Sequence, residues 1–129
     1  MAKNYTLTYS LNMTANSASG YAQSQSGGKT LNITGVDQIA TGRIDVAHDG
    51  DSTVMAAPGH GRFIYVRNLD DTNFVKIYDG ASSAADLIGI LEPGHFLMTI
   101  IRGTGTTVAK ADTATVTIEY AAIEIDANA

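Results

Sequence analysis

The chain has 129 residues, of which 44% are hydrophobic, and it carries a formal net charge of −5 and no cysteine. One domain of this length buries roughly two thirds of its unfolded surface, and no run approaches the roughly 20 apolar residues of a membrane span. The acidic balance disfavours nucleic-acid binding, which needs cations against phosphates, and the lack of cysteine excludes disulfides and thiolate metal sites.

The first predicted strand runs from Lys3 to Thr14, where apolar and polar residues alternate strictly. Tyr5, Leu7 and Tyr9 fall on the apolar face, and threonine, serine and asparagine occupy the other. This period of two is typical of a strand with one buried and one solvated face.

The stretch from Ala15 to Gly28 is small and polar, with Tyr21 at its centre. A stretch of this kind is either a mobile or functional loop or a solvated β-excursion. Residues 1–28 would then form an extended arm plus a mobile loop, and the arm would either reach a neighbouring protomer or the capsid, or pair within its own domain.

Shorter strands follow, and turn residues separate them. Leu69–Thr72 has the length of a short hairpin loop, and Pro93-Gly94 fits the centre of a type II turn. We therefore predict a hairpin from Arg62 to Asp79, with its tip at Leu69–Thr72. The strands predicted here are Thr30–Val36, Arg43–Ala47, Thr53–Ala57, Arg62–Asn68, Asn73–Asp79, Asp86–Leu91 and Phe96–Ile101.

Two strands close the chain, at Thr106–Ala111 and from Asp112-Thr113 through Ile125. In the last one, Val116, Ile118 and Tyr120 share a face, whereas Ile123 and Ile125 have the opposite parity. Because a slip of one residue turns every side chain to the other face, this change predicts either a β-bulge near Ala121-Ala122 or a strand covered on both faces.

No window has helical periodicity with capping residues, so we predict little or no helix. Roughly eight to ten short strands in one chain favour an all-β, antiparallel two-sheet sandwich, jelly-roll-like in its connections. We expect residues 1–129 to make a single β-sandwich domain.

No reactive constellation is visible, so we predict no catalytic residues, no cofactor and no metal. The histidines His48, His60 and His95 lie in or beside turns, where side chains are usually exposed, and none accompanies a nucleophile motif. A small hydrolase is therefore a weak alternative.

Asp45, Asp49 and Asp51 surround Gly50 in an acidic turn. Oxygen-rich loops can bind calcium, but the twelve-residue pattern with its terminal glutamate is missing, and aspartate is also an ordinary turn residue.

The aromatic residues Tyr65, Phe74 and Tyr78 follow strand spacing. They would either pack in the core and between strands or form a sugar-binding platform, as in a carbohydrate-binding module.

The second half of the chain, from Arg62 to Ile125, resembles small structural proteins of tailed bacteriophages. The shared pattern is a strand, an Asn68-x-Asp70-x-x-Asn73 hairpin tip, a Val-x-Ile strand and a Leu91-x-Pro93-Gly94 turn. The closing run Val116-x-Ile118-x-Tyr120 is similar to their last strand.

This resemblance implies a non-enzymatic capsid decoration (cement) protein with a β-sandwich or jelly-roll fold. Its partner would be the major capsid protein, and it would form a homo-oligomer, with a trimer favoured. It would be made in the host cytoplasm and lie on the outer capsid surface of the virion, without binding nucleic acid or membrane. A tail or head-closure protein of the virion is the nearest alternative.

Partner contacts are predicted at the first strand, in the polar stretch and at the turn of the predicted hairpin. The residues concerned are Tyr5, Leu7, Tyr9, Tyr21, Asp70 and Asp71.

Overall fold

The computed structural model describes residues 3–16, 22–36, 39–57, 61–83, 86–102 and 105–124. All elements in these ranges are β-strands, and the ranges hold no helix long and apolar enough to cross a membrane. The strands are β1 (Lys3–Asn16), β2 (Ala22–Val36), β3 (Ile39–Val46), β4 (Ser52–Met55), β5 (Arg62–Asn68), β6 (Val75–Asp79), β7 (Asp86–Leu91), β8 (Phe96–Ile101), β9 (Thr107–Ala111) and β10 (Val116–Glu124).

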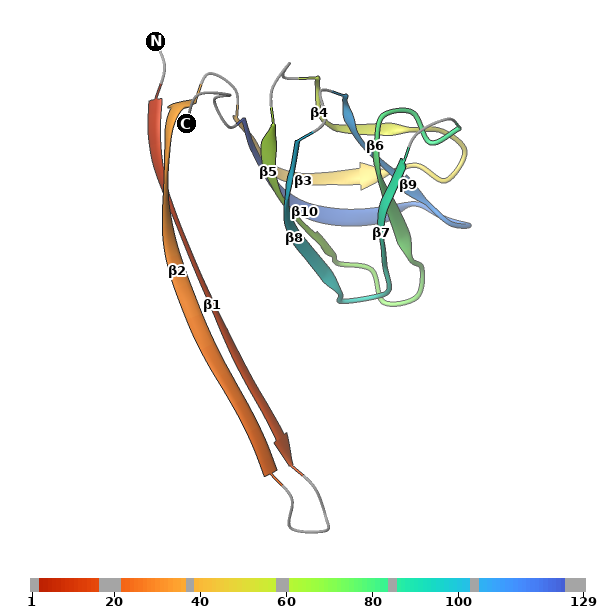
Figure 1. The fold of residues 1–129 in the computed structure, drawn as a ribbon. Helices are drawn as coiled ribbons and strands as arrows, with labels where there is room; N and C mark the ends of the chain where they lie inside the picture. The colour runs from red at the N-terminus through yellow and green to blue at the C-terminus, as the bar shows by residue number, and fades with distance from the viewer. Residues whose placement is uncertain are drawn as a thin grey trace.

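Strands β3 to β10 form two four-stranded antiparallel sheets packed face to face (Figure 1). Sheet I has the order β3-β10-β5-β8, and sheet II has the order β4-β9-β6-β7. Consecutive strands lie in different sheets except β6 and β7, which pair as a hairpin. This is the strand order of a jelly roll, so the predicted all-β sandwich is confirmed.

The core lies between the two sheets and is built from the inward positions of both. Val116 and Ile118 of β10 are fully buried there, and Tyr120 packs against the same cluster, so the face predicted from their spacing is confirmed. Each fully buried side chain of this size contributes about 1.5–3 kcal/mol to the free energy of unfolding.

The predicted hairpin from Arg62 to Asp79 is wrong, because β5 belongs to sheet I and β6 to sheet II. The chain crosses between the sheets here, and the buried Asn68 explains why it does. Its Nδ2 donates to the carbonyls of Asn73 and Leu91, both at 2.9 Å, and its Oδ1 accepts from the Asp70 N–H at 2.8 Å. These bonds hold the corner after β5 and tie it to the end of β7.

The type II turn predicted at Pro93-Gly94 is confirmed. Gly94 has a φ of +77°, and the His95 N–H donates to the Glu92 carbonyl at 2.9 Å. This positive φ at the third position is the feature that makes glycine favourable in a type II turn. The turn joins β7 to β8 and so carries the chain from sheet II back to sheet I.

The bulge predicted at Ala121-Ala122 is wrong. Strand β10 pairs without interruption with both β3 and β5, and Ala122, Ile123 and Glu124 are all buried. The alternative, in which both faces are covered at this end, explains the change of parity: Ala122 faces the core, and Ile123 lies on the outer face, where it pairs with Phe63.

Arg62 links the two sheets from a fully buried position at the start of β5. Its Nε donates to Thr107 Oγ1 on β9, and its Nη2 donates to Asp79 Oδ1 on β6, each at 2.5 Å. A buried charge needs partners of this kind, because its desolvation is otherwise costly.

Strands β1 and β2 form a separate two-stranded sheet, which we call the arm. Residues 22–28 belong to β2, so that part of the polar stretch is a β-excursion rather than a loop. Most of the arm runs clear of the sandwich (Figure 1).

Candidate interaction surface

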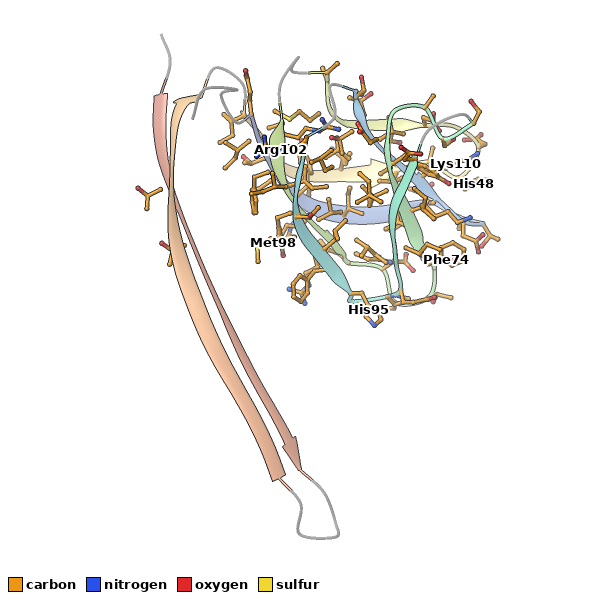
Figure 2. All side chains as sticks on the ribbon, in the orientation of Figure 1. His48, Phe74, His95, Met98, Arg102 and Lys110 are labelled. Atoms are coloured by element: carbon orange, nitrogen blue, oxygen red, sulfur yellow. The ribbon has the colours of Figure 1, made fainter. Side chains whose placement is uncertain are left out.

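An apolar strip lies on the outer face of sheet I. Phe96, Met98 and Ile100 alternate along β8 with exposed fractions of 61%, 41% and 50%. Figure 2 shows Met98 pointing away from the core. We call these three residues the β8 strip. Because the outer face of an antiparallel sheet is normally polar, three large apolar residues in a row mark a candidate binding surface.

The local sequence explains the strip. Leu97 and Ile101 have the opposite parity and pack against the core, so the remaining positions of β8 must face outward. β8 is also an edge strand of sheet I, with β5 on one side only. Sequence reasoning missed this surface, although the apolar residues at both parities of Phe96–Ile101 were its signal.

The apolar surface continues from β8 onto β5. Tyr65 is paired with Met98 in the register, and its ring stacks on Phe96 with centroids 6.5 Å apart and planes 27° apart. These three residues, with Arg67 and Gly94, line a shallow hollow of about 490 Å³. At the other end of the strip, Ile100 is paired with the buried Phe63.

A polar cluster borders this surface on the β10 side. Glu119 accepts a hydrogen bond from the Tyr65 hydroxyl at 3.1 Å and forms an ion pair with Arg43 at 3.4 Å. Partial burial, followed by the hydrogen bond to Glu119, raises the pKa of the Tyr65 hydroxyl above its ordinary value of 10.0. Tyr65 therefore stays neutral at physiological pH and continues to donate to Glu119.

Sheet II has a smaller counterpart on its edge strand β7. Leu87 and Ile90 are 48% and 49% exposed there, and Ile90 is paired with Lys76. A register irregularity between Ile77 and Tyr78 interrupts the alternation of this strand pair, so the two apolar residues do not continue into a row.

The structure gives Asp70 a role in the turn between β5 and β6. Its Oδ1 accepts hydrogen bonds from the backbone N–H groups of Thr72 at 2.7 Å and Asn73 at 2.6 Å. The bond from Asn73 is the main cause of a lowered Asp70 pKa, and the bond from Thr72 is the second. Asp71 is exposed in the same turn. As partner contacts, both remain predictions.

The other predicted contacts lie in the arm or beyond the described part. Tyr5, Leu7 and Tyr9 occupy alternate positions of β1. Tyr21 lies outside the described residues. In Figure 1, most of β1 runs clear of the sandwich that carries the β8 strip.

The acidic turn does not assemble into a metal site in the described residues. Asp45 accepts a hydrogen bond from Thr117 Oγ1 at 2.7 Å, whereas Asp51 accepts from the N–H and hydroxyl of Ser82. The bond from the Ser82 hydroxyl is the main cause of a lowered Asp51 pKa. Within the described ranges, no group of three or more histidine, aspartate or glutamate side chains is placed to hold a metal ion.

The remaining chemistry-bearing residues are dispersed. His48 and His95 are exposed, as their turn positions predict, and His60 lies outside the described residues. Tyr65 and Tyr78 are half-buried on different sheets, so they do not form a common platform with Phe74. None of these three aromatic residues belongs to the core cluster, although Tyr65 packs across strands against Phe96.

Comparison with protein-family models, curated proteins and solved structures finds no match to this chain.

Proposed function

We propose that this chain is a non-enzymatic structural protein of a tailed bacteriophage, which decorates the outer capsid as a homo-oligomer. It binds the major capsid protein and stabilises contacts between neighbouring capsid subunits. The observation that carries this proposal is the β8 strip, a large exposed apolar surface. The buried polar side-chain atoms of the described residues, by contrast, all have hydrogen-bond partners. A surface of this kind is suited to binding another protein.

Three further features support a structural role. The jelly-roll order is common among viral capsid domains, although a fold alone does not decide a function. The net charge of −5 would repel packaged DNA and suits the outside of a shell. The motifs around Asn68 and Pro93-Gly94 resemble those of phage structural proteins, and they build two of the corners at which the chain crosses between the sheets.

Binding to empty capsids of the phage that encodes the chain tests this proposal. We expect the purified protein to sediment with the capsids at a fixed ratio to their subunits and to raise their melting temperature, because a ligand of the native shell stabilises it. Sedimentation with tails or connectors instead would place the protein elsewhere in the virion. Binding to no virion part would overturn the proposal.

A carbohydrate-binding module is a second candidate, favoured by the stacked Tyr65 and Phe96 beside the hollow of the β8 strip. Exposed aromatic rings can stack on sugars, and Arg67 would supply donors to hydroxyl groups. Glycan-array binding by the wild-type protein, lost in Phe96→Ala, would support this function. No binding to any glycan would exclude it in favour of the capsid role.

A further inference from the structure

On β1, the arm has one face of apolar residue types and one of polar types. Strand β2 continues the apolar face opposite Tyr5 and Leu7, whereas Lys29 is opposite Tyr9 on that face. Residues directly opposite each other in an antiparallel pair lie on the same face. Tyr5 is opposite Ile33 and Leu7 is opposite Leu31, whereas Thr8 is opposite Thr30. Thr6 and Thr8 on the polar face are exposed. The alternate positions on the apolar face of β1 are Tyr5, Leu7, Tyr9, Leu11 and Met13.

A two-stranded sheet of this kind is marginally stable in water when nothing covers its apolar face. The arm is a sheet of its own, and none of the sandwich strands pairs with it. Most of the arm also runs clear of the sandwich in Figure 1, so a surface of another molecule would have to cover this face. We propose that the apolar face of the arm docks on the β8 strip of a second copy of this chain.

The position of the arm explains why the receiving strip belongs to a second copy. The arm ends at Val36, just before β3, which is the edge strand of sheet I opposite β8. In Figure 1, most of the arm runs clear of the sandwich and does not lie on the β8 strip of its own copy.

Both surfaces are apolar, and the arm is the longer of the two. The apolar positions from Tyr5 to Met13 span eight residue steps, about 27 Å, whereas the β8 strip from Phe96 to Ile100 spans four steps, about 14 Å. One arm is therefore long enough to cover the strip and the shallow hollow that Tyr65 and Arg67 line beside it. Packed sheets place such faces about 10 Å apart, with their side chains interdigitated.

This contact is heterologous, because the arm of one copy meets a different surface on the next. Such contacts close into rings when the rotation between copies permits it, and in a closed trimer every arm and every strip is covered. The inference rests on the homo-oligomer of the proposed function: it takes the β8 strip as a protein-binding surface and assigns it to the contact between copies, so that contacts with the capsid fall to other surfaces of the oligomer.

Disulfide trapping tests the contact directly, since the chain has no cysteine of its own. We would mix two singly substituted full-length proteins, Leu7→Cys and Ile100→Cys, and oxidise them without any capsid present. A covalent heterodimer is expected, because Leu7 lies on the apolar face of one arm and Ile100 on the strip of another copy. The two cysteines are on separate chains, so docking within one copy cannot produce this product.

Two matched pairs serve as controls. Ile90→Cys replaces an isoleucine of the same exposure on sheet II, at 49% against 50% for Ile100, and Thr8→Cys lies on the polar face of the arm. We expect at least about tenfold less heterodimer from either control, because each places one sulfur away from the contact. Equal trapping with Ile90→Cys would overturn the proposal, and so would a Leu7→Cys homodimer that forms in preference to the heterodimer.

Sedimentation mass provides a second measurement on unlinked protein. Ile100→Asp should raise the dissociation constant of the oligomer at least about tenfold, whereas Ile90→Asp should leave it unchanged. A wild-type chain that stays monomeric, or an oligomer indifferent to Ile100→Asp, would contradict the arm contact. Neither result depends on capsids, so a failure of the arm contact is distinguishable from a failure to bind the virion.

Discussion

The sandwich and the arm use the same alternating sequence pattern to different ends. In the sandwich, the apolar face of each sheet meets that of the other, and no buried side-chain nitrogen or oxygen among the described residues lacks a partner. In the arm, the alternation of β1 is more regular than in most of the sandwich, yet among the described strands it pairs only with β2. Alternation therefore predicts that a strand exists but does not say what covers it. We expect the free energy of unfolding to come from the sandwich and the arm to depend on its partner.

The largest loss of stability should follow from breaking the buried charge pair of the sandwich. Asp79→Ala removes one partner of the fully buried Arg62 and should lower the free energy of unfolding by about 3–5 kcal/mol. Urea denaturation followed by circular dichroism measures this loss. Asp86→Ala, at an exposed position of β7, is the control. Equal stability of the Asp79 and Asp86 variants would show that the link between the sheets contributes little.

A somewhat smaller loss of stability is expected at Asn68, which lies in the corner after β5 and is hydrogen-bonded to the end of β7. Asn68→Ala removes two donated hydrogen bonds and one accepted bond, and it leaves the carbonyls of Asn73 and Leu91 with fewer partners. Each buried group left without a partner costs about 1–3 kcal/mol, so we expect a loss of about 3 kcal/mol. Thermal unfolding measures it. A melting temperature within one degree or so of the wild type would contradict this role for Asn68.

A third change affects only the backbone of the turn between β7 and β8. Gly94→Ala places a side chain at a φ of +77°, where no heavy atom lies within 4 Å of the new Cβ. The cost is therefore conformational, at about 1 kcal/mol. Because this turn also orients the first residue of the β8 strip, chemical shifts of Phe96 should change while those of β4, in sheet II, remain unchanged. A stabilised Gly94→Ala protein would refute the strained-turn argument.

The pH dependence of Asp70 should be weaker still. Its pKa is lowered below the ordinary value of 3.8, so its contribution to stability is present above the unfolded pKa and is lost as the pH falls through the folded value. Below pH 4, the difference in stability between the wild type and Asp70→Asn should shrink toward zero. Denaturation curves across this acidic range test the sign, and a difference that grows on acidification would contradict it.

The smallest effect is expected in the arm. A protein carrying both Leu7→Ser and Leu11→Ser should unfold with the same free energy as the wild type when both are diluted to monomers, within about 0.5 kcal/mol. The same protein should assemble poorly at high concentration. A large loss of monomer stability would show that the arm belongs to the core of its own chain, and it would remove the contrast with the sandwich.

The sequence predicts the strands well because alternation and turn residues are local signals. Arg62–Asn68, Asp86–Leu91 and Phe96–Ile101 have the bounds expected, and the type II turn at Pro93-Gly94 is present. The sheet to which each strand belongs is not a local property. Asn68 holds the corner between β5 and β6 through contacts with residues as distant as Leu91, which no pattern in the turn itself reveals.

The sequence predicted the fold better than it predicted the candidate surface. Both parities of β8 are apolar, and this pattern fits a strand buried on both sides as well as one with an uncovered face. The exposed state of Phe96 and Ile100 depends on the edge position of β8, which follows from the topology of the whole sandwich. Asp70 was predicted as a partner contact because it lies in a turn, whereas its backbone hydrogen bonds require the turn's geometry.

The pairing of β3 with β10 has a consequence for the order of events on the ribosome. These are the first and last strands of the sandwich, so sheet I cannot close until the end of the chain has emerged. Translation adds about 5–20 residues per second, whereas a hairpin forms in about 1–10 μs. The arm, whose strands are neighbours in sequence, is thus available seconds before the β8 strip of the same chain. The arm of a nascent copy can therefore dock on the β8 strip of a finished copy before the nascent copy's own strip can receive an arm.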